Sequence, residues 1–254
     1  MSESIRVAVL GAAGRMGQVV CRAVTDERGL DLVARLDVGD DVAALSGVDV
    51  AVDFTVPAAT EANVHALIDA GVHAVVGTTG WTAEALDRVR AHLGRQPAAH
   101  VVVAPNFALS AVLAMRFAAQ AAKYFESAEV VELHHPDKAD APSGTALHTA
   151  RLIAAARREA GCGPVPDATT TALDGARGAD VEGVRVHAVR LRGLMAHEEV
   201  LLGNAGEQLT IRADSFDRAS FMPGVLLAIR SVARLPGLTV GLDRVLDLVG
   251  PPAR

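Results

Sequence analysis

The stretch Ile5-Arg-Val-Ala-Val-Leu-Gly-Ala-Ala-Gly-Arg-Met-Gly17 decides the fold of the first half of this 254-residue chain. A β-branched, apolar run leads into three glycines, and an apolar helical pattern then occupies residues 16–24. Gly11 permits a tight turn, Gly14 lets the backbone approach a pyrophosphate, and Gly17 allows the helix to pack close to the strand. The stretch predicts a strand, a nucleotide-binding turn and a helix. The alternative is a glycine-rich turn that holds no ligand.

Asp37 closes the second expected strand, about 20 residues beyond the glycine turn, where an acid commonly accepts hydrogen bonds from the adenosine ribose hydroxyls. An acid at this point disfavours the 2′-phosphate of NADPH, and the neighbouring Val38 brings no compensating charge. Arg15, however, projects from the turn and can neutralise that phosphate. We therefore expect both NADH and NADPH to serve, with no strong preference for NADPH.

Strands alternate with helices over the first hundred residues, which predicts a Rossmann-type, doubly wound parallel sheet in an α/β fold. We expect strands at 5–10, 30–36, 48–54, 73–77 and 100–104, and helices at 16–24, 59–70 and 82–93. Ligands of such sheets lie at the carboxyl ends of the strands. The loops Gly77-Thr-Thr-Gly80 and Ala104-Pro-Asn-Phe107 should therefore border the nicotinamide, unless they serve only as turns.

The pattern changes after a helix expected at 109–122. A strand ending at His134, a long helix from Gly144 to about Ala160 and an extended loop over 163–180 come next. Three strands without intervening helices (184–191, 197–202 and 208–213) then predict a second, α+β domain built on a mixed sheet. The tail, 218–248, reads as helical again. We expect a dinucleotide-binding domain from residues 1–106 and 215–254, and a substrate-binding and oligomerisation domain from residues 107–214.

The segment His134-His-Pro-Asp-Lys-Ala-Asp-Ala-Pro-Ser-Gly-Thr145 places two histidines and a lysine before a helix start. Ser143 can cap that helix, and the unpaired N–H groups of Gly144 and Thr145 then form an anion site beside Lys138. Taken separately, these features also suit a core histidine, a solvated lysine and an ordinary helix cap. Their coincidence predicts a site that holds a small anion and moves a proton.

Glu132-Leu-His-His-Pro-Asp-Lys-Ala-Asp-Ala-Pro-Ser-Gly-Thr-Ala146 closely resembles the signature of the 4-hydroxy-tetrahydrodipicolinate reductase (dihydrodipicolinate reductase) family of bacterial lysine biosynthesis. Gly11–Gly17, Asp53–Thr55, Gly77–Gly80 and Ala104–Phe107 match that family in the same order, so the resemblance covers essentially the whole chain. It implies a homotetrameric NAD(P)H-dependent oxidoreductase. The enzyme would reduce 4-hydroxy-tetrahydrodipicolinate to tetrahydrodipicolinate, with loss of water, on the diaminopimelate route to lysine.

The resemblance also implies roles for individual residues. His134 would donate and accept the proton and Lys138 would be a second donor, while His135, Gly144 and Thr145 would contact the substrate carboxylates next to Ser143. Many NADPH-using members carry arginine where this chain has Val38, which leaves the cofactor preference open. The cofactor would touch Gly11, Ala12, Ala13, Gly14, Arg15, Met16, Asp37, Gly77, Thr78, Thr79, Ala104, Pro105, Asn106 and Phe107.

Composition and charge narrow the function classes. The net charge of −6 argues against a nucleic-acid or anionic-membrane surface. Without a signal peptide or a bilayer-length apolar run, a cytoplasmic protein is expected. Adjacent strand residues point to opposite faces, so His134 and His135 should not chelate one metal, and no metal site is expected. Two alternatives stay open: another two-domain NAD(P)-dependent dehydrogenase acting on an amino or imino acid, and a non-catalytic nucleotide-binding sensor.

Overall fold

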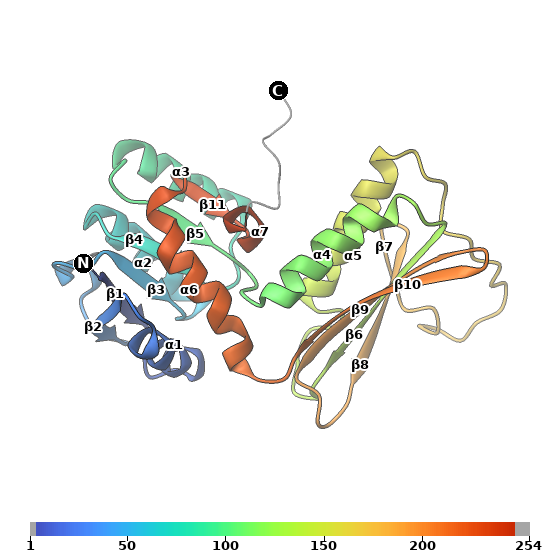
Figure 1. Cartoon of the computed structure of the whole chain (residues 1–254), viewed down its shortest axis with the longest axis horizontal. Coiled ribbons are helices and arrows are strands. Elements are labelled where there is room, and N and C mark those ends of the chain that lie inside the picture. Colours follow the sequence, from blue (N-terminus) through green and yellow to red (C-terminus); the bar gives the residue numbers. More distant parts are fainter. Residues whose placement is uncertain (1–3, 247–254) are drawn as a thin grey trace. The chain divides into compact units, whose positions relative to one another are not determined.

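The computed structural model describes residues 4–246 and divides the chain into two compact units. The first combines the chain up to Ala108 with the segment that starts at Arg218, and the second is Leu109–Asp217. These divisions lie a few residues beyond the expected ones at 106 and 214. In Figure 1 the first unit accordingly contains both the blue N-terminal and the red C-terminal elements.

The first unit is built on a six-stranded sheet in the order β11-β5-β4-β3-β1-β2, and all its paired strands run parallel. Val7, Ala8 and Val9 in the β1 strand are all fully buried, so both faces of the sheet are covered. The elements are β1 Ile5–Leu10, α1 Arg15–Asp26, β2 Leu30–Leu36, η1 Val42–Ala44, β3 Val50–Asp53, α2 Pro57–Asp69, β4 His73–Val76, α3 Ala83–Arg95, β5 Val101–Val103, η2 Arg218–Phe221, α6 Met222–Ser231, η3 Val232–Arg234, β11 Leu238–Val240 and α7 Leu242–Val245. The predicted doubly wound parallel sheet is confirmed.

The C-terminal tail differs from the helix expected over 218–248. Its described part contains the strand β11, Leu238–Val240, which pairs in parallel with β5 at the edge of the sheet. Three residues are too few to show a period of two, and the Pro236-Gly237 pair was the one local sign of a break. Residues 247 and 248 of the expected helix lie outside the described residues.

The second unit is built on a five-stranded mixed sheet in the order β10-β9-β6-β8-β7. Strand β6 runs antiparallel to β9 and parallel to β8, as the predicted mixed sheet requires. The short strand β7 was not expected, because it lies in the Gly-, Pro- and Thr-rich segment interpreted as a loop. The elements are α4 Leu109–Ala122, β6 Ser127–His134, α5 Gly144–Glu159, β7 Ala179–Val181, β8 Val184–Arg190, β9 Ala196–Asn204 and β10 Glu207–Ser215.

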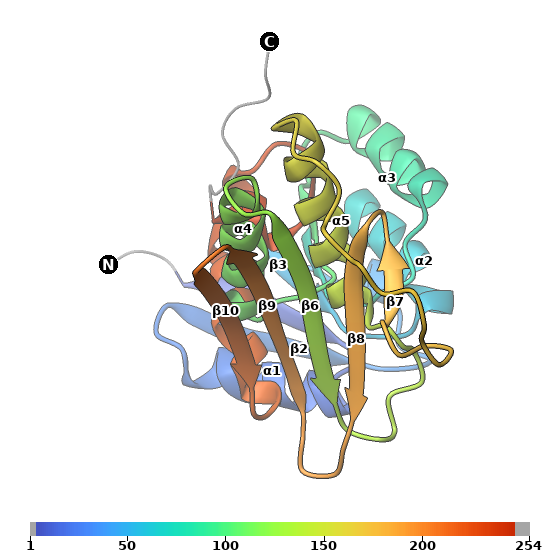
Figure 2. The ribbon, with the colours of Figure 1, turned by 90° about the vertical axis from the view of Figure 1, so that its right-hand side faces the viewer.

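Helices α4 and α5 contact each other and cover one face of this sheet, and Figure 2 shows the opposite face toward the viewer. Small residues make the close approach possible, because Ala118 and Ala122 of α4 and Ala146 and Ala150 of α5 are fully buried in the same core. Along β6 the burial alternates: Ala128, Val130 and Glu132 point into this core. The helix-covered face of β6 therefore carries a buried acid at its carboxyl end.

A pair of histidines makes the first unit sensitive to acid. The His73 Nδ1 atom accepts a hydrogen bond from the backbone N–H of His100 at 3.0 Å, and the two rings stack with centroids 5.1 Å apart. Burial and the neighbouring His100 lower the pKa of His73. The folded state therefore binds fewer protons at this site than the unfolded chain, so its contribution to stability is present above about pH 6.5 and is lost as the pH falls.

We predict that His73→Asn flattens this pH dependence, because an amide oxygen can accept the same hydrogen bond and does not titrate. Between about pH 7.5 and pH 5.5 the variant should lose roughly 0.5–1.5 kcal/mol less stability at β4 and β5 than the wild-type chain, the net worth of one hydrogen bond. Amide hydrogen exchange at β4 and β5, corrected for intrinsic rates, measures this. Equal losses in both proteins would contradict the assignment.

Candidate active site

The glycine turn after β1 has the close packing that its sequence predicted. Gly11 has a positive φ of 75°, and a Cβ atom on Gly17 would lie 2.0 Å from the carbonyl oxygen of Gly11. Gly14 occupies the N-cap of α1 and makes no side-chain cap. The first turn of a 12-residue helix thus starts directly against the end of the strand, where its N–H groups favour an anion.

Asp37 lies beside this turn. Its Oδ2 atom accepts a hydrogen bond of 2.8 Å from the backbone N–H of Ala13. The contact follows from the register, since β1 and β2 are neighbouring parallel strands and Leu10 pairs with Leu36. The acid that the sequence assigned to a ribose is therefore at the carboxyl edge of the sheet, next to the turn assigned to a pyrophosphate.

A cavity of about 560 Å³ opens over these residues, within the range typical of small-molecule sites. Five of the predicted cofactor residues line it: Gly11, Gly14, Arg15, Met16 and Asp37. The segments Val38–Asp40 and Phe54–Val56 and the side chain of Asn63 also line it, and the sequence had assigned no cofactor contact to them. A turn of small residues, a helix N-terminus, an acid and a cavity of this volume together fit a dinucleotide.

The loops after β4 and β5 meet through Phe54. A Cβ atom on Gly77 would lie 2.1 Å from the Phe54 ring, so only glycine permits this approach. The rings of Phe54 and Phe107 lie 5.9 Å apart, and Phe107 is buried. The backbone N–H of Ala104 donates to the Val76 carbonyl at 3.0 Å. Phe54 therefore connects the cavity wall with both loops that the sequence placed near the nicotinamide.

Asp53 fixes the loop that follows β3 and the loop that follows β4, and sequence reasoning left this residue without a role. It is fully buried, and its carboxylate accepts hydrogen bonds from the N–H and hydroxyl of Thr55, the amide of Asn63 and the hydroxyl of Thr78. The Thr78 hydroxyl thus binds a protein carboxylate at 2.8 Å. The Thr78 side chain thus helps to hold the loop after β4 in place.

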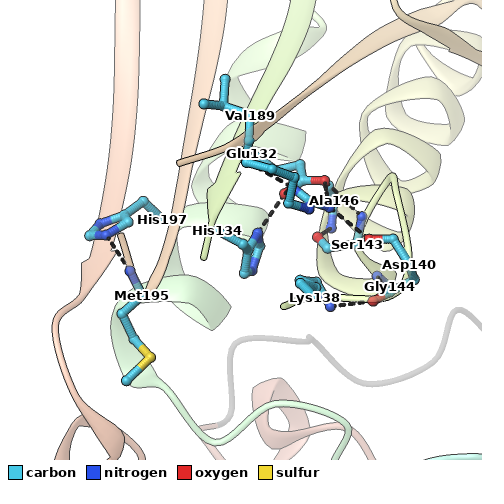
Figure 3. A network of polar contacts seen from close by, with 11 residues as sticks. Glu132, His134, Lys138, Asp140, Ser143, Gly144, Ala146, Val189, Met195 and His197 are labelled. Carbon is cyan, nitrogen blue, oxygen red and sulfur yellow. Dashed lines mark hydrogen bonds and ion pairs between the residues drawn. The ribbon is translucent and has the colours of Figure 1, made fainter. Parts of the chain in front are cut away.

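The second unit carries the histidine site at the carboxyl end of β6 (Figure 3). The His134 Nδ1 atom lies 2.5 Å from Oε2 of Glu132, which is fully buried. Arg190 on β8 binds both oxygens of the same carboxylate at 2.8 Å each. Burial disfavours a charged Glu132, yet the hydrogen bonds from Arg190 and His134 lower its pKa. Burial also lowers the pKa of His134, against the opposing effect of Glu132.

The loop between β6 and α5 brings Lys138 to the first turn of α5. Lys138 Nζ lies 2.6 Å from one oxygen of Asp140, and the other oxygen accepts a hydrogen bond of 3.3 Å from the Gly144 N–H. Hydrogen bonding to Lys138 lowers the pKa of Asp140. Figure 3 shows Lys138, Asp140 and Gly144 together beside the helix start. The lysine and the helix amide thus hold one carboxylate jointly.

This geometry corrects one detail of the sequence interpretation. The Gly144 N–H was expected to be unpaired, but it donates to Asp140, because the loop returns this acid to the positive end of the helix. The predicted Ser143 cap is confirmed, since its hydroxyl accepts from the Ala146 N–H. His135 directly follows β6 and opens the loop, and its carbonyl accepts from the Lys138 N–H. Thr145 lies in the first turn of α5.

Sequence reasoning missed Glu132, Asp140 and Arg190. Glu132 stands two residues before His134 in a strand, so both side chains share a face, and this signal could have identified the acid. Arg190 had no local signal, because it reaches the site only through the pairing of His134 with Arg190 across β6 and β8. Asp140 was part of the quoted segment, but nothing in the sequence shows that its carboxylate binds the predicted anion site.

Within residues 4–246, no group of three or more His, Cys, Asp or Glu side chains is placed to hold a metal ion. None of the helices in that same range combines the length and the apolar character needed to cross a bilayer.

Comparisons with known proteins agree with the division of the chain into two units. Residues 5–107 match the family model "Dihydrodipicolinate reductase, N-terminus", and residues 110–246 match "Dihydrodipicolinate reductase, C-terminus". The chain belongs to the dihydrodipicolinate reductase family. A 4-hydroxy-tetrahydrodipicolinate reductase from Beutenbergia cavernae is 72% identical over 96% of this chain and all of that protein. One from Nocardia farcinica is 61% identical over 96% of this chain and all of that protein.

A solved structure supports the same family. The dipicolinate-bound dihydrodipicolinate reductase from Paenisporosarcina sp. TG-14 is 37% identical, covers 95% of this chain and 99% of its own, and has a TM-score of 0.83. An amine dehydrogenase from Mycobacterium smegmatis, at 13% identity and a TM-score of 0.65, shares only the fold. The predicted family, and with it an oxidoreductase that uses a nicotinamide cofactor, is confirmed. The other dehydrogenase and the non-catalytic sensor are set aside.

Proposed function

We propose that this dihydrodipicolinate reductase family member converts 4-hydroxy-tetrahydrodipicolinate to tetrahydrodipicolinate with NADH or NADPH, on the diaminopimelate route to lysine. The observation that carries the substrate assignment is the carboxylate of Asp140, which Lys138 and the Gly144 N–H hold together. A cradle that binds a protein carboxylate can bind a substrate carboxylate in the same way. The proton-carrying His134 lies at the end of the strand that leads into this loop.

His134 supplies the proton in this proposal. Loss of water from the substrate leaves a ring conjugated to an imine, and the reduced nicotinamide, when bound, supplies hydride to that ring. The resulting enamine carbon needs a proton, which an imidazolium donates readily near neutral pH. The His134 side chain is 13% exposed, so it can regain the proton from water after each turnover.

Lys138 and the start of α5 hold the dicarboxylate. Lys138 offers a point charge, and the N–H groups of Gly144 and Thr145 lie at the positive end of a 16-residue helix. Binding requires the substrate carboxylate to displace Asp140 from these donors. His135 and Ser143 flank the same loop and complete the proposed contacts. Much of the rate then comes from positioning the ring against His134.

The cofactor contacts are proposed for the glycine turn, Asp37 and the two loops. Gly11, Ala12, Ala13, Gly14, Arg15 and Met16 would hold the pyrophosphate, Asp37 the adenosine ribose, and Gly77, Thr78, Thr79, Ala104, Pro105, Asn106 and Phe107 the nicotinamide end. Five of these residues line the cavity beside α1, which supports the proposal. No metal takes part in it.

We also propose a cytoplasmic homotetramer. The face of the second sheet opposite α4 and α5 carries half-buried apolar side chains on three neighbouring strands, among them Val131, Val189 and Leu201. Sheet-to-sheet packing between subunits would bury them, and closed symmetry is the usual form of such assemblies. Cys21 and Cys162 are both free thiols, which suits a reducing compartment.

The assay of the reductase activity uses substrate made in situ from pyruvate and aspartate semialdehyde, followed by oxidation of NADH or NADPH. We predict that His134→Gln lowers kcat by about 10²–10⁴-fold with near-normal cofactor affinity, because general acid catalysis contributes this much. Lys138→Ala should instead mainly raise KM, because Lys138 is proposed to hold the substrate carboxylate.

His187→Gln is the matched control for His134→Gln, because His187 also pairs with a glutamate of β6, at 2.7 Å from Glu129. A wild-type chain that oxidises neither cofactor would refute the function, and full turnover in His134→Gln would refute the role of His134.

The choice of cofactor is tested at Arg15. We predict that Arg15→Ala weakens NADPH binding selectively, by about tenfold, because only NADPH carries the 2′-phosphate that this guanidinium would neutralise. Dissociation constants for NADH and NADPH, measured by fluorescence titration on both proteins, give the ratio. Equal losses for the two cofactors would show that Arg15 acts on the shared pyrophosphate instead.

The molecular mass of the protein in solution tests the proposed homotetramer. Sedimentation equilibrium should give about four times the 26.3 kDa of the chain. Val131→Asp, on the uncovered face of the sheet, should shift the mass toward smaller species because it would bury a charge in the proposed interface. Leu209→Asp on β10 is an exposed-residue control. A wild-type monomer or dimer would refute the tetramer.

A further inference from the structure

Glu132 connects the proton donor with the anion cradle. Its Oε2 atom contacts His134 Nδ1 at 2.5 Å and Arg190 Nη1 at 2.8 Å, and its Oε1 atom accepts from Arg190 Nη2 at 2.8 Å and from the Ser143 N–H at 3.1 Å. The side chain is fully buried. One carboxylate therefore joins β6, β8 and the start of α5, the three elements from which the site is built.

The charge of Glu132 determines which ring nitrogen of His134 holds a proton. A carboxylate is an acceptor only, and the two-point contact with Arg190 keeps this one ionised. His134 Nδ1 must then be the donor to Glu132, so Nδ1 keeps its hydrogen in both the neutral and the charged ring. The atom that gains and loses the proton is Nε2, on the opposite edge of the ring.

We propose that Glu132 is a positioning residue for the reduction: it fixes the His134 imidazole so that Nε2 is the nitrogen that delivers the proton to the substrate. This inference rests on the proposed function, and it adds a residue to which neither the family signature nor the substrate contacts assign a role. Arg190 acts one step further out, because it holds the carboxylate and also donates to the Asp140 carbonyl of the cradle loop at 2.7 Å.

The anion also stabilises the protonated ring. Burial is the largest influence on His134 and lowers its pKa, the charge and hydrogen bond of Glu132 raise it, and the charges of Lys138 and Arg190 lower it. On β9, the neighbouring strand, Glu198 is paired in register with Glu132 and is buried, which raises the pKa of Glu198 to about 7. Burial, Lys138 and Arg190 all disfavour the charged ring of His134, and Glu132 favours it. Neutralising Glu132 should therefore lower the pKa of His134 further.

The test is Glu132→Gln, assayed for kcat, KM and their pH dependence. We expect kcat to fall about 10²-fold, within the range seen when a group that orients a catalytic side chain is removed. KM for the substrate should change less than about threefold, because the variant leaves Lys138 and Gly144 in place. The alkaline limb of the kcat profile should move to lower pH, since the proton-donating form is then lost earlier. A merely structural glutamate would not move that limb.

A second readout needs no activity. The ring nitrogens of His134, observed by proton–nitrogen correlation NMR, should show a hydrogen on Nδ1 in the wild-type chain when the ring is neutral. In Glu132→Gln the amide can donate as well as accept, so a mixture of tautomers is expected. An unchanged tautomer and an unmoved pH profile in this variant would overturn the inference while the reductase function stands. A wild-type chain without activity would instead refute the function.

Two further variants keep the test interpretable. Glu129→Gln is the matched control, because Glu129 lies on the same strand and binds both His187 Nε2, at 2.7 Å, and Arg177, outside the proposed site. It should leave kcat and the pH profile unchanged. If the uncompensated charge of Arg190 prevents Glu132→Gln from folding, the double variant Glu132→Gln/Arg190→Met removes both charges of the pair. The same shift of the pH limb is expected there, and its absence would overturn the inference.

Discussion

The buried carboxylate of Glu132 is the constraint on which the second unit depends. Removing a charged group from water is costly, and the cost is offset only if each oxygen is well hydrogen-bonded. Here Arg190 supplies two of the bonds, and His134 and the Ser143 N–H supply the rest. The strand, its neighbour and the helix start must therefore come together correctly, because a partial arrangement would leave a buried charge unpaired. The hydrogen bonds of Glu132 thus determine both the geometry of the site and the stability of the unit.

The first unit also contains a buried, fully hydrogen-bonded carboxylate. Asp53 at the carboxyl end of β3 is fully buried, and it accepts hydrogen bonds from Thr55, Asn63 and Thr78 on the loops and the helix around it. Loops at the carboxyl edge of a parallel sheet are otherwise held by few contacts, yet they carry the ligand contacts. In both units, therefore, a buried acid at the carboxyl end of a strand holds the neighbouring loops by hydrogen bonds. These loops carry the residues proposed to bind the ligands.

The parts of the fold that the sequence predicted are those with local signals. Gly11, Gly14 and Gly17 revealed the turn, because each glycine has its own steric reason, and the capping residue Ser143 marked the start of the long helix α5. Strand β11, at three residues, was too short for a pattern, and it depends on pairing with β5. The site divided in the same way. His134 and Lys138 stood out by residue type and context, whereas Arg190 and the Asp140 contact arise from cross-strand pairing and loop closure, which leave no trace in neighbouring residues.

The contrast between Glu132 and Glu198 shows why partners matter more than burial. The two acids are paired in register on β6 and β9, and both are buried. Glu132 has the guanidinium of Arg190 and a lowered pKa, whereas Glu198 is bound by the Thr149 hydroxyl, and burial raises its pKa to about 7. Two adjacent anions would repel each other in this core, so ionisation of one favours the neutral form of the other. Because Arg190 selects Glu132 as the charged member, the negative charge lies beside His134, where it can stabilise an imidazolium.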